Sequence, residues 1–160
     1  MYEIGLNLST IDTTAQFKLG TVISTPGTAG PTKTYKYIKY LAASAAIAGV
    51  AGNVCYYPTV AIQDAAGDID NTTVTSDLSD SLEVGAGVLQ ASLTDGSFGW
   101  IQVRGMATVT TALTAGADGD PLTPTGSTDG TLDVVAAVTD DVCATAIDIS
   151  AKIINCCFKY

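Results

Sequence analysis

The chain has 160 residues, of which 47% are hydrophobic and only 14% charged, and 16 carboxylates against 7 cations give a formal net charge of −9. A chain of this length is expected to form one domain around one sizeable hydrophobic core. Because binding to phosphate groups requires clustered Lys and Arg, the acidic balance argues against nucleic acid as a partner.

No segment of the sequence is suited to a membrane. The longest apolar stretch, LAASAAIAGVAG at residues 41–52, is too short and too poor in large side chains to span a bilayer. The opening residues, MYEIGLNLST, lack both the basic start and the apolar run of a signal peptide. We therefore expect a soluble protein, made in a cytoplasm, without a membrane partner.

The first part of the chain predicts an extended arm followed by short strands. Residues 1–16 have no strong hydrophobic period and are expected to form an N-terminal arm that docks on a partner or a neighbouring subunit. Residues 17–24 predict a first strand, and the Pro/Gly-rich residues 25–32 predict a loop. In residues 33–42, Tyr and Ile alternate with Lys and Thr, which is typical of a half-buried strand.

The same strand contains the nearest approach to a basic cluster, formed by Lys33, Lys36 and Lys39. Tyrosines interleaved with lysines can bind single-stranded nucleic acid. An ordinary solvated strand explains the pattern better in so acidic a chain.

Residues 43–52 are rich in Ala, which favours a helix, but each Gly would cost about 1 kcal/mol against Ala there. We predict a turn-rich connection, with room for one helical turn, that leads into a strand at residues 53–62. Residues 63–82 are polar and predict a loop with a short strand or helical turn, and residues 84–93 predict a further strand.

Residues 98–113 alternate clearly, with Trp100, Gln102 and Arg104 on one face of the predicted strand. Residues 113–131 are one turn after another, and residues 132–140 and 144–160 predict two closing strands. Short strands separated by turns, without a convincing amphipathic helix, predict an all-β sandwich or barrel. We therefore divide the chain into the arm, residues 1–16, and a single β-domain, residues 17–160.

Histidine is absent from the sequence, which limits the chemistry available to the protein. The Ser-His-Asp route is excluded, and a catalytic thiol would have no histidine to activate it. The spacing of the four cysteines, Cys55, Cys143, Cys156 and Cys157, fits no zinc pattern. We interpret them as free thiols, with a disulfide between chains, or between Cys55 and one of the C-terminal pair, as the alternative.

Two groups of aspartates could hold Ca²⁺ or act as an acid–base pair. Asp64, Asp68 and Asp70 form one group, and Asp118 and Asp120 form the other. Both lie in Gly-rich stretches where Asp is a good turn former, and neither matches an EF-hand loop, so we interpret them as turn residues. We predict no metal site and no cofactor.

The segment GSFGWIQVRG, residues 96–105, holds the only Trp and the only Arg of the chain. Trp and Arg are favoured at binding hot spots, which makes Trp100 and Arg104 candidate interface residues. The alternative is that Trp100 belongs to the core and Arg104 lies at its rim.

One internal echo is present. Residues 46–56, AIAGVAGNVCY, and residues 113–123, LTAGADGDPLT, align without gaps, so that Gly49 matches Gly116 and Gly52 matches Gly119. Two interpretations are open: a repeated β-unit or a common hairpin device, and the second is slightly favoured.

The order of these motifs resembles that of tailed-bacteriophage head decoration proteins, also called capsid cement proteins. The likeness rests on the block GVLQASLTDGSFGWIQVRG, in which Phe98–Val103 stands for a YGWVQV-like strand, on the AGDPL-like turn at Ala115–Leu122, and on the late stretch TLDVVAAVTDD. It covers residues 17–140 approximately. The arm and the CCFKY tail have no counterpart.

The resemblance implies a structural protein without catalysis, with a β-tulip-like body. Proteins of this family bind the outer surface of the assembled capsid, commonly as trimers near threefold positions, and hold neighbouring major capsid proteins together. The expected partners are therefore the major capsid protein and further copies of the chain in a homotrimer, and the expected location is the outer surface of the virion. For the contacts we expect Tyr2, Ile4 and Leu6 in the arm, with Trp100 and Arg104 as weaker candidates.

Two other functions remain as alternatives. A virion surface adhesin would bind host glycans through exposed Tyr35, Tyr37 and Trp100 and the Asp-rich loops. A carboxylate-based hydrolase ranks last, because the chain has no histidine.

Overall fold

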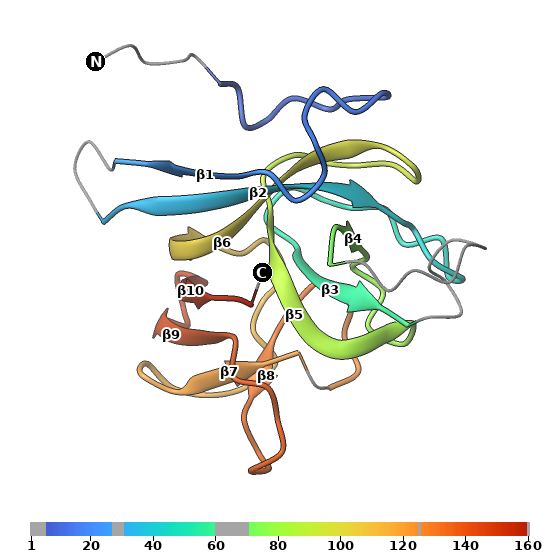
Figure 1. Cartoon of the computed structure of the whole chain (residues 1–160). Helices are drawn as coiled ribbons and strands as arrows, with labels where there is room; N and C mark the ends of the chain where they lie inside the picture. The colour runs from blue at the N-terminus through green and yellow to red at the C-terminus, as the bar shows by residue number, and fades with distance from the viewer. Residues whose placement is uncertain (1–5, 27–30, 60–70, 125, 160) are drawn as a thin grey trace.

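The computed structural model describes residues 6–26, 31–59, 71–124 and 126–159 (Figure 1). Over these ranges the chain is all-β, with ten strands in one hydrogen-bonded sheet and no helix. The sheet is not closed into a barrel, so of the two predicted architectures the sandwich-like one describes the fold. The strands are β1 Val22–Thr25, β2 Lys33–Tyr40, β3 Val54–Pro58, β4 Thr73–Val74, β5 Ser81–Leu89, β6 Phe98–Thr108, β7 Pro121–Thr123, β8 Asp133–Val134, β9 Ala144–Asp148 and β10 Ile153–Cys157.

The sheet is organised around β6, its longest strand. One edge of β6 pairs with β2, and the other edge pairs first with β5 and then with β10. The main path runs β1-β2-β6-β10-β9-β7-β8, and β5 carries β3 as a branch. All pairings are antiparallel except the two-residue pairing of β4 with β2. Because β6 holds three partners, it joins every part of the sheet.

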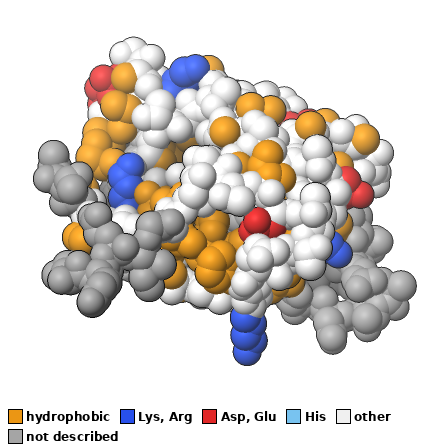
Figure 2. All heavy atoms as spheres, turned by 90° about the horizontal axis from the view of Figure 1, so that it is seen from above, with side chains coloured by type: hydrophobic (Ala, Val, Ile, Leu, Met, Phe, Trp, Pro, Cys, Tyr) orange, Lys and Arg blue, Asp and Glu red, His pale blue; other side chains and the backbone are white. Residues whose placement is uncertain are grey.

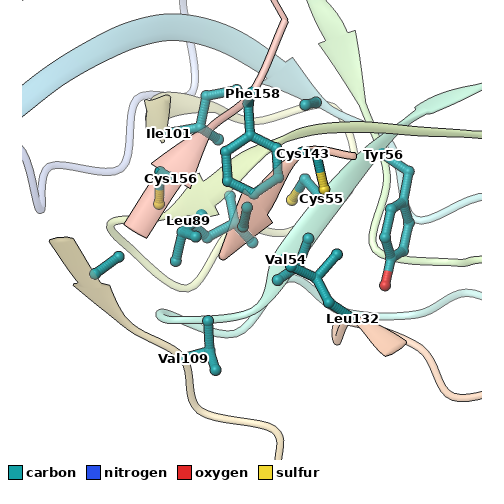
Figure 3. Packing of buried hydrophobic residues seen from close by; sticks show 14 of the residues in the cluster. Val54, Cys55, Tyr56, Leu89, Ile101, Val109, Leu132, Cys143, Cys156 and Phe158 are labelled. Carbon is teal, nitrogen blue, oxygen red and sulfur yellow. The ribbon is translucent and has the colours of Figure 1, made fainter. Parts of the chain in front are cut away.

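The main core lies inside this folded-over sheet (Figure 3). Alternate residues of β2 and β6, including Ile38, Tyr40, Ile101 and Val103, point into it and are fully buried. Val54 and Tyr56 of β3, Leu89 of β5, and Leu132 and Phe158 beside β8 and β10 complete this core. This two-residue period follows from the pleat of a strand. The strands predicted within residues 33–42 and 98–113 are present as β2 and β6, but β2 is buried on both faces rather than half-buried, and β6 ends at Thr108.

The two similar segments of the sequence, residues 46–56 and 113–123, contain two turns that bind a neighbouring strand segment through the same hydrogen bonds. Asn53 N–H donates to Val50 O at 2.9 Å and Asp120 N–H to Ala117 O at 3.2 Å, and the Gly at the third position has a φ of 86° in one turn and 93° in the other. Gly52 N–H donates to Leu89 O, and Leu89 N–H donates to Asn53 O. In the second turn, Gly119 N–H donates to Ala146 O, and Ala146 N–H donates to Asp120 O.

A strand follows each of these turns and pairs with the strand on which the turn docks. β3 pairs with β5, and β7 pairs with β9. The order β3-β5-β6-β10-β9-β7 is therefore symmetric about the contact between β6 and β10. The matching hydrogen bonds and the symmetric order together favour a repeated β-unit over a shared hairpin device.

Several predicted boundaries are wrong. Residues 17–21 form a turn in which Thr21 N–H and Oγ1 donate to Lys18 O, so β1 begins later than predicted. The predicted strand 144–160 is instead a hairpin over residues 144–157, because Asp148 accepts hydrogen bonds from Ser150 and Ala151 and closes a turn between β9 and β10. Residues 121–123, predicted as part of a run of turns, form β7.

Three other segments also differ from prediction or refine it. Only residues 133–134 of the predicted strand 132–140 are extended, because the Asp140 carboxylate accepts the N–H groups of Ala136 and Ala137 and closes a loop. Residues 43–52 form turns, as predicted, and residues 73–74 form the short strand that was one of two options. The loop aspartates Asp64, Asp68 and Asp70 lie outside the described residues.

The two equivalent turns provide a matched pair of variants. Gly52→Ala and Gly119→Ala each force an L-residue into the left-handed region, at about 1–2 kcal/mol. A Cβ on Gly119 meets nothing within 4 Å, whereas one on Gly52 would overlap Thr110 Oγ1, which donates to Ala51 O. We expect Gly52→Ala to lower the free energy of unfolding by at least about 1 kcal/mol more than Gly119→Ala. Urea unfolding measures both, and equal losses would contradict the close packing of the first turn.

Candidate functional site: the arm and its aromatic seat

The outer face of β2 and β6 carries a second apolar cluster, separate from the main core. Tyr35, Tyr37 and Trp100 are buried there, and Phe98 packs beside them. We call these four residues the aromatic seat. Tyr37 pairs with Trp100 across the strands, so their side chains share one face of the sheet while Ile38 and Ile101 point to the main core. Leu6, Leu8, Leu19 and Ile23 pack against the seat from outside.

The N-terminal arm covers this seat (Figure 1). Asp12 forms an isolated antiparallel bridge with Phe98: Asp12 N–H donates to Phe98 O at 3.0 Å and Phe98 N–H donates to Asp12 O at 2.8 Å. Tyr37 Oη donates to Asp12 Oδ2 at 2.6 Å and accepts from Gln16 N–H at 3.2 Å. One backbone bridge and one tyrosine hydroxyl therefore fix the described part of the arm on the sheet.

The rings of the seat contact one another and Phe17, which follows the arm. The Tyr37 and Trp100 ring centroids are 5.1 Å apart, and Phe17 meets both rings edge-on at 5.2 and 5.3 Å. Tyr37 and Phe98 are stacked at 6.5 Å. Edge-to-face and offset pairs of this kind add about 0.5–1.5 kcal/mol each beyond burial. Phe17 is nevertheless 40% exposed, so its ring is only partly covered.

Burial raises the pKa of Tyr37 to about 12, and the hydrogen bond that its hydroxyl donates to the Asp12 carboxylate acts in the same direction. The phenol therefore stays protonated at neutral pH and remains a donor. The contact between arm and seat is therefore an uncharged hydroxyl bound to a carboxylate, beside aromatic rings.

The predicted contact residues have different positions in the structure. Leu6 is half-buried against the seat, Arg104 is exposed, and Trp100 is only 1% exposed, covered by its own arm. Trp100 thus belongs to a core cluster and Arg104 lies outside it, which was the alternative interpretation. Tyr2 and Ile4 lie outside the described residues. Of the predicted set, the structure brings Leu6 and Trp100 into one cluster.

Arg104 is separated from the seat by an irregularity in the sheet. The register between β2 and β6 shifts between Thr34 and Tyr35, opposite Arg104 and Gln102. The Gln102 side chain is buried and donates to the backbone oxygens of Arg104 and Met106, at 3.1 and 3.0 Å, which holds the distorted strand in place. The simple alternation that put Trp100 and Arg104 on the same face therefore does not extend past Gln102.

Sequence reasoning missed the residues that hold the arm. Asp12 and Gln16 lie in a segment without periodicity, and their partners lie far along the chain. The only signal available was the concentration of aromatic residues at positions 35–37 and 98–100, which indicates a packed face but not what covers it.

The basic strand β2 is less solvated than predicted. Lys36 is 2% exposed and its Nζ donates to Asn71 O at 2.5 Å and to Tyr57 Oη at 3.3 Å. Lys36 Nζ also lies 5.4 Å from the centre of the Tyr57 ring. Lys33 and Lys39 are half-buried on the seat side. Lys36 therefore points away from its two neighbours, and the three amines do not form one basic stripe.

A second candidate is an open pocket of about 590 Å³ between the β4–β5 and β7–β8 connections. Asp77, Glu83 and Asp129 line it, together with Ser79 and Ser81. Asp77 accepts hydrogen bonds from Ser79 N–H and Oγ, and Asp129 accepts one from Leu78 N–H. Both carboxylates therefore accept hydrogen bonds from backbone N–H groups. Among the described residues, no group of three or more His, Cys, Asp or Glu is placed to hold a metal ion.

The aspartates of the second sequence group are turn residues, as predicted. Asp120 Oδ2 accepts Ala117 N–H at 2.8 Å, and Asp118 Oδ1 accepts Ile149 N–H at 2.9 Å. Each carboxylate is therefore engaged by the backbone of a loop.

The four cysteines are free thiols, as the first interpretation predicted. Cys55, Cys143 and Cys156 are buried, and burial raises the pKa of each thiol, to about 12 for Cys55 and Cys156. Cys157 is exposed on β10. The buried thiols stay protonated and act as small core side chains.

Comparison with protein-family models, curated proteins and solved structures finds no match to this chain. Within the described ranges, no helix has the length and apolar character needed to cross a membrane.

Removing the Tyr37 hydroxyl should loosen the arm. Tyr37→Phe deletes a hydrogen bond to a carboxylate, worth about 1.5–3 kcal/mol, while keeping the ring in the seat. We expect acrylamide to quench the fluorescence of Trp100, the only tryptophan, more strongly in this variant. Tyr57→Phe is the matched control, because its hydroxyl donates to Lys159 O at a distance from the arm. Equal quenching in both variants would show that the hydroxyl does not hold the arm.

Stability should fall in strong alkali. The pKa of Tyr37, Tyr40 and Tyr57 is raised by burial from 10.0 to about 12. The folded state therefore prefers the neutral phenols, and their contribution is complete below pH 10 and lost as the pH rises toward 12. Urea unfolding across this range should show a steadily decreasing free energy of unfolding. A constant value would contradict the burial of these hydroxyls.

Proposed function

We propose that the protein is a structural component of a phage virion that binds the outer surface of the assembled capsid and cements neighbouring major capsid proteins, without catalysing a reaction. The observation that carries the proposal is the arm with its linker, residues 17–21: this segment packs outside the main core and still presents apolar side chains to solvent. Ile11 is 50% exposed and Phe17 is 40% exposed. Such side chains are available to a partner surface.

The distribution of charge supports the arm side as the docking face. Four of the seven cations, Lys18, Lys33, Lys39 and Arg104, lie on the linker after the arm, β2 and β6, and the fifth cation of these elements, Lys36, is buried and points away from the seat. In the described parts of the arm, β1, β2 and β6, Asp12 is the only carboxylate. Figure 2, which shows this side, has hydrophobic side chains spread across it and only isolated charged groups. This side therefore combines apolar side chains with an excess of cations over carboxylates, which suits a partner surface of complementary charge.

The opposite end of the molecule is acidic. Residues 116–159 contain seven aspartates against Lys152 and Lys159. An acidic outer end would keep decorated particles apart by repulsion, and a ligand that binds only the assembled shell stabilises that shell by mass action. Many copies acting together would multiply a modest individual affinity.

The aromatic residues expected to bind glycans are buried in this structure. Tyr35, Tyr37 and Trp100, predicted as exposed stacking residues, are 6%, 0% and 1% exposed. Buried rings cannot stack on a sugar while the arm is in place, so we do not propose this function.

A charged residue on the arm should weaken capsid binding. Ile11→Asp places a carboxylate where the proposed contact is apolar, and we expect at least a tenfold loss, corresponding to about 1.4 kcal/mol. Val138→Asp is the control, because Val138 is fully exposed on a loop at the acidic end. Co-sedimentation with undecorated, expanded capsids of the source phage measures both. Equal binding by Ile11→Asp and the wild type would remove the arm from the contact, and failure of the wild type to bind would remove the proposed function.

A further inference from the structure

We propose that neighbouring copies exchange arms, so that the aromatic seat of each copy holds residues 6–16 of a second copy in the assembled oligomer. This inference rests on the proposed function, in which copies stand side by side on the capsid and use the arm as a contact. It assigns a specific occupant to the seat, a second copy of this chain.

An arm cannot leave its seat empty without a large exposure of aromatic surface. The arm side chains Leu6 and Leu8 pack on the cluster of Tyr37 and Trp100, beside Leu19 and Ile23, and both rings are almost completely buried. An arm that reached out to a neighbour without replacement would expose these rings to water, which is unfavourable. An identical arm from the neighbour restores the same apolar packing, the Asp12–Phe98 bridge and the Tyr37–Asp12 hydrogen bond.

The arm packs on the outer face of the sheet, away from the main core. The main core contains no residue of the arm, and the cluster around the seat is separate from it. Residues 17–21 join the arm to β1. Exchange therefore requires a change of direction in this linker and no rearrangement of the sheet, which is the situation in which domain swapping has a low cost.

The arm and its linker also leave two apolar side chains partly uncovered. Ile11 and Phe17 are half-exposed when the arm lies on a seat in one copy. An arm that crosses between two bodies runs along their junction, where the neighbouring surface can cover both side chains. Such a contact is heterologous, because each copy gives an arm at one surface and receives one at another, and it closes when the copies form a ring such as a trimer.

The test uses the pairing of Asp12 with Phe98. The two residues exchange both backbone hydrogen bonds, which places their Cα atoms about 5.5 Å apart, within the range of a disulfide. The double variant Asp12→Cys/Phe98→Cys is made in a Cys157→Ser background, which removes the exposed native thiol. It is bound to capsids, oxidised and run on a denaturing, non-reducing gel.

Arm exchange predicts covalent dimers and larger species from decorated capsids. Bridged monomers alone would overturn exchange, and so would the absence of any bridge, because the proposal keeps residues 12 and 98 paired. Should the double variant fail to fold, copies carrying Asp12→Cys alone are mixed with copies carrying Phe98→Cys alone, so that any 12–98 bridge must join two chains. If the variant binds capsids and forms bridges only within single chains, arm exchange is refuted and the proposed function is not. If the wild type does not bind capsids, the proposed function is refuted.

Discussion

The structure depends on the two-sided burial of β2 and β6. Because successive side chains of a strand point to opposite faces, Tyr37 and Trp100 point outward and the residues that follow them, Ile38 and Ile101, point toward the main core. On the inner side, Ile38 and Ile101 meet the other strands of the folded-over sheet. On the outer side, Tyr37 and Trp100 meet no other layer of the sheet, and the arm covers them instead. The arm is therefore required by the amino-acid composition of these two strands.

This constraint gives the protein two cores of different character. The main core is formed by residues from most of the strands and is held by the ladders of the whole sheet. The seat is covered by a terminal segment with one backbone bridge. Local opening free energies follow the number of contacts and hydrogen bonds that must break, so the arm should open without unfolding the body. A part that opens independently is suited to a contact with neighbours, and this links the fold to the proposed cementing role.

Much of the fold could be predicted because its signals are local. The alternation of Tyr and Lys in residues 33–42 and the pattern after Gly99 identified β2 and β6, and the turn residues separated most of the other strands. The hairpin of β9 and β10 was missed because an apolar run hides the turn that Asp148 and Ser150 close. The candidate site could be predicted only in part. The arm was expected to dock on a partner or a neighbouring subunit, whereas its described residues lie on the sheet of the same chain. Trp100 was expected to be either an interface or a core residue, and its cover was not identified. The contact of Asp12 with Phe98 and Tyr37 joins distant segments through a backbone bridge and a single hydroxyl, neither of which leaves a period or motif in the sequence.

Native-state hydrogen exchange tests the independence of the two cores most directly. The Phe98 amide donates to Asp12 O in the arm, and the Val54 amide donates to Gly130 O beside the main core. If the arm is a separate unit, the Phe98 amide exchanges with a distinctly lower opening free energy and a smaller dependence on denaturant than the Val54 amide. If both amides exchange only through global unfolding, with the same free energy, the arm is an integral part of a single cooperative core, and the division of the protein into two cores is contradicted.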